Sequence, residues 1–363
     1  MKKGAWGRSL LLACAGLLLL LAAGCQTAGY YGQAIAGQYE ILAHQAPVGQ
    51  LIKDPGTDPK LKARLELVLQ LRQFAARELK LRPDGSYVGY VDLHRPCVAW
   101  IVNVAPPLSL QPKTWWFPIV GRVSYRGYFH LAAARRYAAH WEKKGWDTYV
   151  ADVPAYSTLG WLHDPLLNTF IFEPEADLAD TIFHELTHQL LFVPGDTDFN
   201  EGLAMTVAAE GVRRWFEASG NTQAYQRYQE GLQHENDFVR LVMATRQELQ
   251  KVYHDAQLPG AAKLRRKAEI IEETRRRYAA LKSSWGVSQC GYDEWFAQPI
   301  NNAQLNTVAA YYDLAPAFQA LLRAQGGDME KFFQAARDLA KLPLAKRRQA
   351  LRAHLNPMET ESH

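Results

Sequence analysis

Hydrophobic residues recur along this chain with helical spacing in some stretches and with strand spacing in others. Residues 31–46 and 60–79 place apolar side chains three and four positions apart, which predicts two amphipathic helices. Residues 125–144 contain many alanines and predict a third helix. The first two segments carry no residues that suggest chemistry, so we expect them to support the fold.

Between residues 86 and 124 the spacing changes to two, as in half-buried strands. Segments 98–104, 115–120 and 146–153 are rich in β-branched and aromatic residues and predict further strands. Pro118 would confine the second of these to a sheet edge, because proline cannot donate a ladder hydrogen bond. We therefore expect a mixed or antiparallel sheet. Four aromatic residues of this region could pack in the core or line a substrate cleft: Trp115, Trp116, Tyr125 and Tyr128.

The second half of the chain is predicted to be largely helical. Residues 224–254 and 261–281 form two long helical patterns separated by Leu258-Pro259-Gly260, which indicates an antiparallel helical hairpin. Its arginines and glutamates interleave, as on a solvated face with ion pairs. The predicted fold class is α+β, with a core over residues 25–220 and a helical region over 221–363 packed on it.

A helix with candidate chemistry is predicted from Glu175 onward. Acidic residues fill its first turn, its apolar face is continuous, and Pro194-Gly195 would stop it. The helix contains His184-Glu185-Leu186-Thr187-His188. Residues four apart share a helix face, so His184 and His188 can aim two imidazole nitrogens at one point. In this His-Glu-x-x-His pattern the histidines bind Zn²⁺ and the glutamate, Glu185, acts on a zinc-bound water.

Glu201 is the predicted third ligand. It follows His188 by thirteen residues, within Asn200-Glu201-Gly202-Leu203-Ala204. It would complete the two-histidine, one-glutamate set of a catalytic zinc site, whose fourth position stays open. Asn200 is the expected cap of a helix over residues 202–216. The alternative is a core helix whose two histidines are solvated or hydrogen bonded.

Two kinds of supporting residue are expected around such a site. Asp180 lies one turn before His184 and is placed to hold the second nitrogen of that imidazole. A hydroxyl donor would stabilise the oxyanion that forms during hydrolysis, and Tyr311 and Tyr312 are the candidates. Tyr225 and Tyr228 are the second choice, and each tyrosine could instead simply pack in the core.

The motif His-Glu-x-x-His followed by Asn-Glu-Gly-x-Ala resembles the gluzincin metallopeptidases. More of the chain resembles a bacterial family of predicted aminopeptidase lipoproteins. The matching segments, besides the zinc motif and the N-terminal signal, are Ser124–Phe129, Gly145–Tyr149, Ala155–Trp161, Asp164–Thr169 and Asn301-Asn302. The resemblance implies a zincin-like fold, a zinc cofactor and a peptide substrate.

The resemblance also implies a place for the substrate backbone. In zincins an edge strand just before the metal helix pairs with the peptide. The local candidate is Tyr156, Ser157, Thr158, Leu159 and Gly160, because glycine permits close backbone approach. The alternative is an internal strand followed by a turn.

The N-terminus has the pattern of a secretory signal. Lys2, Lys3 and Arg8 precede an apolar stretch over residues 10–23 that is short for a membrane span, so residues 1–24 are expected to be removed. Ala22-Ala23-Gly24-Cys25 resembles a bacterial lipobox, in which Cys25 is lipidated and becomes the N-terminus. An ordinary cleaved signal is the alternative. Gln26 suggests, by resemblance to Gram-negative lipoproteins, the outer membrane facing the periplasm.

Composition narrows the possible partners. The chain is 48% hydrophobic and 11% aromatic, which is enough for a substantial core. Its net charge of +4 falls to about +1 without the signal, so nothing indicates nucleic acid binding. Cys97 and Cys290 remain, and they could pair in an oxidising compartment or stay buried thiols.

The leading hypothesis is zinc-dependent peptide hydrolysis, with aminopeptidase action suggested by the resemblance. The alternatives are an endopeptidase that processes envelope proteins and a zinc-binding envelope lipoprotein without peptidase activity. Aminopeptidase action needs a carboxylate that binds the substrate amine, and the sequence leaves several possibilities open: Asp164, Asp198, Glu210 and Glu294.

Overall fold

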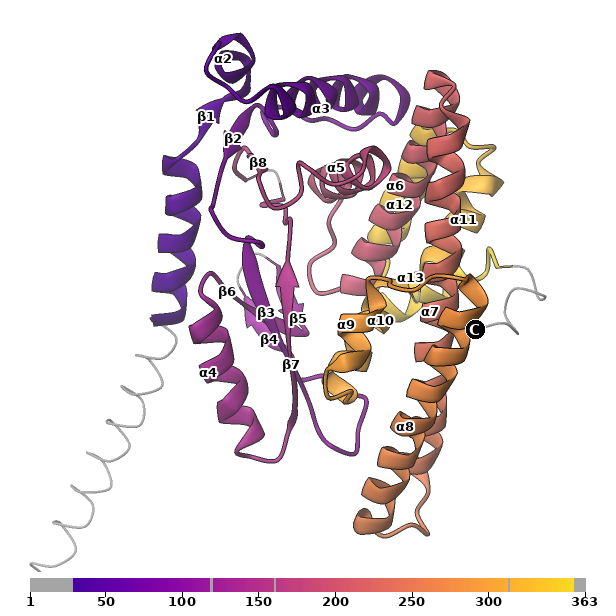
Figure 1. Ribbon diagram of the computed structural model, residues 1–363. Helices are drawn as coiled ribbons and strands as arrows, with labels where there is room; N and C mark the ends of the chain where they lie inside the picture. Colours follow the sequence, from indigo (N-terminus) through magenta and orange to yellow (C-terminus); the bar gives the residue numbers. More distant parts are fainter. Residues whose placement is uncertain (1–28, 118–119, 160, 313, 356–363) are drawn as a thin grey trace, which may run out of the picture.

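Helices predominate in this mixed α+β structure, and its strands form three small sheets (Figure 1). The computed structural model describes residues 29–117, 120–159, 161–312 and 314–355, without the side chains of 310–312. The predicted α+β class is confirmed. The predicted signal segment, Cys25 and Gly160 lie outside the described residues. Within the described part of the chain, no helix combines the length and the apolar character needed to span a bilayer.

The N-terminal helices follow the predicted spacing. Residues 29–43 are helical and lead through β1 (Ala46–Pro47) and α2 (Val48–Lys53) to α3 (Pro59–Glu78). Asp58 caps α3, because its carboxylate accepts hydrogen bonds from the backbone N–H groups of the first turn. The buried stripe of α3 is the predicted one: Leu65, Val68, Leu71, Phe74 and Ala75.

The largest strands form an antiparallel sheet in the order β6-β3-β7. They are β3 (Ala99–Ala105), β6 (Tyr125–Tyr128) and β7 (Asp147–Val153), and α4 (Leu131–Glu142) packs on β3 and β7. The predicted helix from residue 125 is therefore wrong at its start. Tyr125–Tyr128 pair with Trp100–Asn103, because this register buries the Tyr128 ring against the sheet core.

Two smaller sheets complete the β structure. β2 (Gly89–Val91) pairs with β1 in antiparallel orientation and with β8 (Leu166–Leu167) in parallel orientation. β4 (Trp115–Phe117) and β5 (Gly121–Val123) form a separate antiparallel ribbon. The backbone N–H of Gly195 donates to Val120 at 3.0 Å, which ties this ribbon to the loop after the predicted metal helix.

That helix is α5 (Glu175–Leu190), and it packs side by side with α6 (Thr197–Ser219). Gly211 allows the two helices to approach closely, because a Cβ there would lie 2.5 Å from the Phe183 ring on α5. The start of α6 differs from the prediction. Asp196 caps it, and Asn200 lies inside it.

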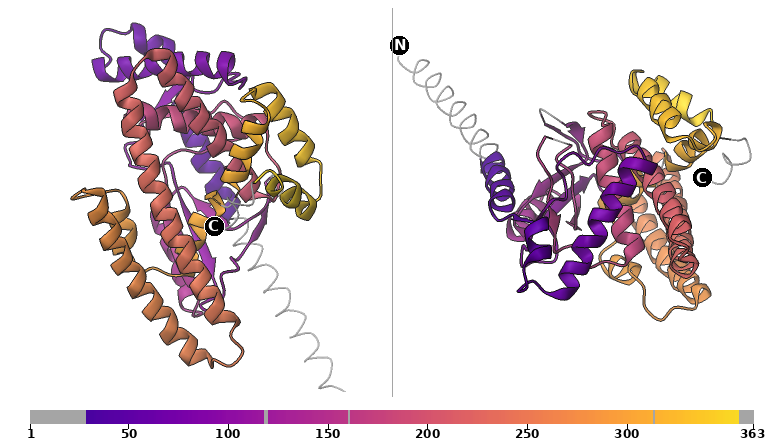
Figure 2. Two further views of the ribbon diagram at one scale, coloured as in Figure 1. Left: turned by 90° about the vertical axis from the view of Figure 1, so that its right-hand side faces the viewer. Right: turned by 90° about the horizontal axis from the view of Figure 1, so that it is seen from above.

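The predicted hairpin is present as α7 (Thr222–His254) and α8 (Gly260–Trp285), which run along one side of the molecule (Figure 2). Buried polar residues attach it to β7. The Lys267 ammonium on α8 donates to Asp147, whose carboxylate also accepts the backbone N–H of Asn302 at 2.9 Å. The Asn302 amide in turn accepts from the Tyr253 hydroxyl on α7 at 2.9 Å. The Asn301-Asn302 pair singled out in the sequence therefore joins the hairpin to the sheet.

The remaining helices close the structure. α9 (Tyr292–Ala297) and α10 (Asn302–Tyr312) follow the hairpin, and α11 (Ala315–Ala324), α12 (Met329–Ala340) and α13 (Leu344–Arg352) end the chain. The last three share one hydrophobic cluster with α3, α5 and α6. Cys97 and Cys290 are free thiols that lie in two other clusters, so they do not pair.

We predict opposite effects on stability for alanine at two helical glycines. Gly211→Ala should destabilise the protein by about 1–3 kcal/mol, because its Cβ overlaps buried side chains. Gly231→Ala, on the exposed surface of α7 with nothing near its Cβ, should stabilise it by up to about 1 kcal/mol. Chemical denaturation midpoints measure both. If the two variants shift in the same direction, Gly211 does not set the α5–α6 distance.

Candidate metal centre

Three side chains from α5 and α6 converge as the sequence predicted. His184 and His188 project from the same face of α5, and Glu201 meets them from the second turn of α6. The Nε2 atoms of the two histidines are 3.1 Å apart. The Oε2 atom of Glu201 lies 3.1 Å from Nε2 of His184 and 3.6 Å from Nε2 of His188. Of the residues described, these three form the group with the composition and spacing to hold a metal ion.

The distances fit a tetrahedral ion. Zn²⁺ binds imidazole nitrogen and carboxylate oxygen at roughly 2.0–2.2 Å, so neighbouring ligand atoms of a tetrahedral site lie about 3.3–3.5 Å apart. The three separations in this chain lie close to that range on either side. The three atoms therefore form one triangular face of a tetrahedron, and the fourth corner is free of a protein ligand among the described residues.

The site is buried but not sealed. The side chains of His184, His188 and Glu201 are 16%, 9% and 15% exposed, so a small ligand can reach them. Burial lowers the pKa of His184, but the hydrogen bond and charge of Glu201 outweigh it and leave that pKa raised. Burial raises the pKa of Glu201, and the two histidines more than reverse this. The cluster is thus held by the attraction between a positively charged His184 and a negatively charged Glu201. A bound cation would replace the positive charge of His184 in this pair.

Glu185 lies beside this cluster without a structural role of its own. Burial raises the pKa of its carboxyl group, while the charges of His184 and His188 oppose the shift. No hydrogen bond or ion pair among the described residues involves this carboxylate. The Glu185 side chain is half-buried, so this unpartnered carboxylate is available for a ligand or water.

The structure revises the role of Asp180. Its carboxylate accepts a hydrogen bond of 2.8 Å from the Tyr228 hydroxyl on α7, and no hydrogen bond to His184 is found among the described residues. Asp180 still acts on His184 through its charge, which favours the protonated imidazole. Tyr228, a second-choice oxyanion donor, is therefore occupied as a partner of Asp180. The Nδ1 atom of His188 is buried and has no partner in the described part of the chain.

Residues 156–159 do not form the predicted strand, and their role in substrate binding stays a prediction. Residues 154–159 form a loop after β7, and Gly160 lies outside the described residues. The buried carboxylate of Asp164 accepts hydrogen bonds from the backbone N–H of Thr158 and the hydroxyl of Ser157. Gln189, next to His188, also donates to Asp164 at 3.1 Å. A side chain thus satisfies the N–H group that a neighbouring strand would have used.

The predicted oxyanion donors remain a sequence prediction. Tyr311 and Tyr312 are the last residues of α10, and their side chains lie outside the described residues. The structure instead draws attention to Tyr125, the first residue of β6. Burial raises the pKa of its phenol, and the charges of Glu201 and Glu185 raise it further, so the phenol lies near both carboxylates.

The other three aromatic residues of that sequence region have different surroundings. Trp115 donates its indole N–H to the Tyr137 hydroxyl at 2.9 Å, and Tyr128 packs on Tyr30 and Tyr137. Both are therefore packing residues. Trp116 is 63% exposed on the β4–β5 ribbon. Sequence reasoning could not separate Tyr125 from the rest, because the charges of Glu201 and Glu185 act on it only in the folded chain.

The start of α6 is fixed by the last helix of the chain. Asp196, 2% exposed, caps α6 and accepts a hydrogen bond of 2.6 Å from Arg347 on α13. Arg348 adds a longer contact to Asp196, at 3.1 Å. Asn200 holds the loop before α6, because its amide both donates to and accepts from the backbone of Val193. Glu201, the next residue, is positioned by these contacts.

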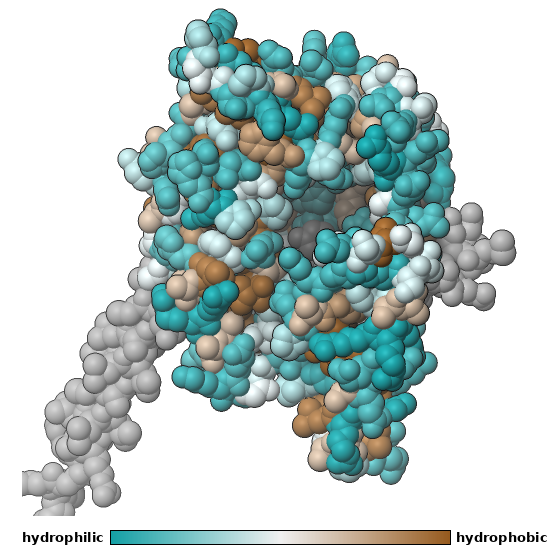
Figure 3. Space-filling view, in the orientation of Figure 1, coloured by the Kyte–Doolittle hydropathy of each residue, from teal (hydrophilic) through white to brown (hydrophobic). Residues whose placement is uncertain are grey.

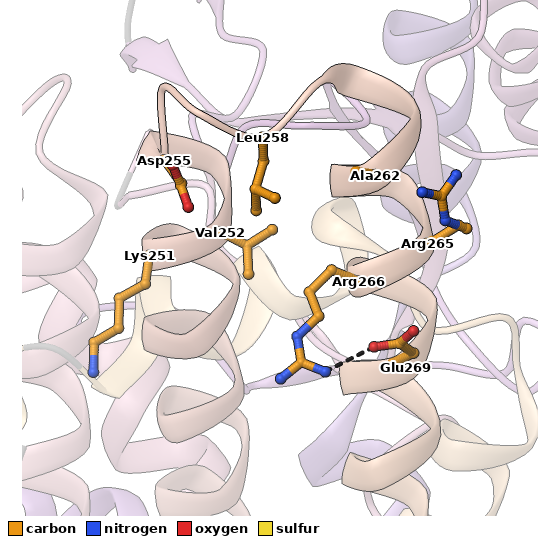
Figure 4. A pocket seen from close by; sticks show the side chains of 8 residues that line it. All are labelled: Lys251, Val252, Asp255, Leu258, Ala262, Arg265, Arg266 and Glu269. Atoms are coloured by element: carbon orange, nitrogen blue, oxygen red, sulfur yellow. Dashed lines mark hydrogen bonds and ion pairs between the residues drawn. The ribbon is translucent and has the colours of Figure 1, made fainter.

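The surface near the cluster is hollowed. In Figure 3 the hollow lies between α5 on one side and α9 and α10 on the other, next to the helices that carry the three ligands. A different pocket lies at the closed end of the α7–α8 hairpin, and Figure 4 shows its lining. That pocket is open to solvent and far along the chain from the metal-ligand cluster. Its lining residues are Lys251, Val252, Asp255, Leu258, Ala262, Arg265, Arg266 and Glu269.

A comparison with protein families gives a match over residues 29–351. The family is described as "Putative aminopeptidase". The chain belongs to this family. The match extends over the sheet, the three converging side chains and the hairpin. Searches of curated proteins and of solved structures found no match. The family points to a peptidase, and the ligand geometry is the observation that links it to a metal.

We predict that Arg347→Met destabilises the protein by about 3 kcal/mol, because it leaves the buried Asp196 carboxylate without its closer partner. Zinc affinity should also fall, since the start of α6 loosens. Arg348→Met is the matched control. Its side chain is 35% exposed, so the loss should stay below about 1 kcal/mol. Denaturant unfolding and zinc titration measure both variants, and equal losses would contradict the assignment of Arg347.

Proposed function

We propose that this protein is a zinc-dependent peptide hydrolase of the aminopeptidase type. The observation that carries the proposal is the triangle formed by His184, His188 and Glu201, with the unpartnered Glu185 carboxylate beside it. The family match supports peptidase action, and the two-histidine, one-glutamate ligand set supports zinc. The zincin-like arrangement of the metal helix is part of the same proposal.

Each residue of the candidate site would have its own part in peptide hydrolysis. Zn²⁺ bound by His184, His188 and Glu201 would polarise the scissile carbonyl and lower the pKa of the attacking water. Glu185 would accept a proton from that water and return it to the leaving amine. Its surroundings suit this task, because desolvation raises the pKa of the carboxyl group and makes the carboxylate a stronger base toward the attacking water.

Tyr125 is our proposed donor to the oxyanion. Its phenol lies near both Glu185 and Glu201, and no hydrogen bond to its hydroxyl is found among the described residues. A phenol is protonated at neutral pH, and burial raises its pKa further, so Tyr125 can donate. A preorganised donor of this kind is worth a few kcal/mol of transition-state stabilisation.

Glu185 also favours an enzyme over a simple zinc-binding protein, because a binding site does not need a buried carboxylate without a partner. Aminopeptidase action is favoured over endopeptidase action by the family description alone. Three of the candidate carboxylates for the substrate amine already have structural partners. Asp164 binds Thr158, Asp198 binds Arg348, and Glu210 binds Arg213 and Arg214. Glu294 on α9 is exposed.

The first functional prediction separates the two glutamates at the site. Glu185→Gln should keep about one zinc per chain, because it removes no ligand, and should lower peptide turnover by roughly 10²–10⁴-fold. Glu201→Gln should weaken zinc binding, because a neutral amide replaces an anionic oxygen. Metal analysis and single-turnover hydrolysis are measured on both variants.

Two further comparisons complete that experiment. The double variant His184→Ala with His188→Ala should lose the metal, and retention of full zinc content would disprove the site. N-terminally free peptides should be cleaved and their N-acetylated counterparts should not. If the wild-type protein holds zinc but cleaves no peptide, the non-catalytic zinc-binding function replaces the hydrolase.

For the oxyanion donor, Tyr125→Phe should lower turnover by about 10²–10³-fold while zinc content stays the same. Tyr128→Phe, three residues further along β6 and packed in the core, is the matched control and should stay close to wild type. Unchanged turnover in Tyr125→Phe would assign the donor to another group, with Tyr311 and Tyr312 the next to test.

The proposed location is the periplasmic side of the bacterial envelope, with Cys25 carrying a lipid anchor, on the outer membrane. Cys25→Ser should release the protein from the membrane fraction and abolish acyl labelling. Cys14→Ser, within the predicted signal segment, is the matched control and should change neither. Acyl labelling that persists in Cys25→Ser would disprove the lipobox interpretation.

A further inference from the structure

The N-terminal helix, residues 29–43, has an apolar face that the rest of the described chain does not cover. Tyr31, Ile35 and Tyr39 are 37%, 69% and 71% exposed. They lie four positions apart, so they line one side of the helix over about 12 Å. The only charged side chain in this helix is Glu40. We call Tyr31, Ile35 and Tyr39 the outer stripe.

The opposite side of the same helix explains why the stripe must face outward. Tyr30 packs on Tyr128, and the Arg126 guanidinium stacks over the Tyr30 ring at 3.9 Å. Gln33 exchanges hydrogen bonds with the backbone of Gly127 and Phe129. These contacts fix the rotation of the helix on β6, so it cannot turn the outer stripe inward.

Figures 1 and 2 show the helix along an outer edge of the molecule, on the side away from the α7–α8 hairpin. Three large apolar side chains on an exposed helix face, almost without charge, are unusual for a surface bathed in water. Tyrosine, with an apolar ring and a polar hydroxyl, is the residue type found where a helix meets the headgroup region of a bilayer.

We propose that the outer stripe lies against the phospholipid surface and sets the orientation of the protein on it. The inference goes beyond the hydrolase function and rests on the proposed lipidation of Cys25. Tyr31 lies six positions after Cys25, and six extended residues span at most about 20 Å. A chain anchored at Cys25 therefore keeps this helix next to the bilayer. The near absence of charge means that the contact is hydrophobic and should resist salt.

The test uses the full, lipidated chain reconstituted into phosphatidylethanolamine–phosphatidylglycerol vesicles. The background variant is Cys290→Ser, and Cys97 is buried, so neither of these thiols takes up the label. In this background Ile35→Cys, or in a second protein Tyr39→Cys, carries an environment-sensitive fluorophore. Leu264→Cys on α8, 48% exposed in the wild type, is the matched control. Probes at 35 and 39 should emit at shorter wavelength, be quenched by spin-labelled phospholipid and resist aqueous iodide at low and high salt. The probe at 264 should behave in the opposite way.

Three results would overturn the proposal. The probes at 35 and 39 could match the probe at 264 in chains that are acylated. They could become water-exposed at high salt. They could be shielded in native envelopes but water-exposed in protein-free vesicles, which would assign the stripe to a protein partner. If the wild-type protein carries no acyl label, the anchor on which the proposal rests is disproved. Peptide turnover would be unaffected by the failure of either the stripe or the anchor.

Discussion

The close packing of α5 against α6 is the contact on which the candidate site depends. Two of the three ligands come from one helix and the third from the other, so the distance between the helices sets the size of the triangle. Small residues keep that distance short. Gly211 lies against Phe183, and a Cβ on Gly202 would lie 3.1 Å from the backbone of Leu314 and Ala315, so Gly202 lets the start of α11 pack on α6. The metal geometry is therefore a result of helix packing more than of the ligand side chains alone.

Polar contacts buried away from the ligands hold this arrangement in place. Arg347 on the last helix forms an ion pair with Asp196. Gln189 and the loop before β8 donate hydrogen bonds to Asp164. Each carboxylate is buried and has several donors, so each favours one backbone position. The hairpin is attached in the same manner, through Asn302, Lys267 and Asp147. The sheet, the metal helices and the C-terminal helices thus form a single framework around the cluster.

The metal helix and its ligands were predictable because their signals are local. Four-residue spacing places His184 and His188 on one face whatever surrounds them, and Glu201 is close in sequence. The hairpin was predictable from two long helical patterns separated by a Pro-Gly turn. These features need no knowledge of the tertiary fold.

The errors arose where a tertiary contact decides between local alternatives. Asp196 and Asn200 are both good helix caps, and only the Val193 loop shows that Asn200 is used elsewhere. Residues 156–159 have strand-like composition, but the Asp164 carboxylate, six positions further along the chain, satisfies the Thr158 N–H. Tyr125 comes under the influence of the charges of Glu201 and Glu185 only in the folded chain, which residue spacing does not encode.

The pairing of Arg347 with Asp196 has a consequence for the order of events in synthesis. The ligands His184 and Glu201 are 17 positions apart, so the loop that joins them is cheap to close and the helix pair can form early. The arginine that fixes the start of α6 lies 151 positions after its partner. A chain emerging from the ribosome, or from a translocation pore, therefore has the three candidate ligands long before it has the residue that holds them in register. The geometry of these three side chains is complete only when the last helix docks.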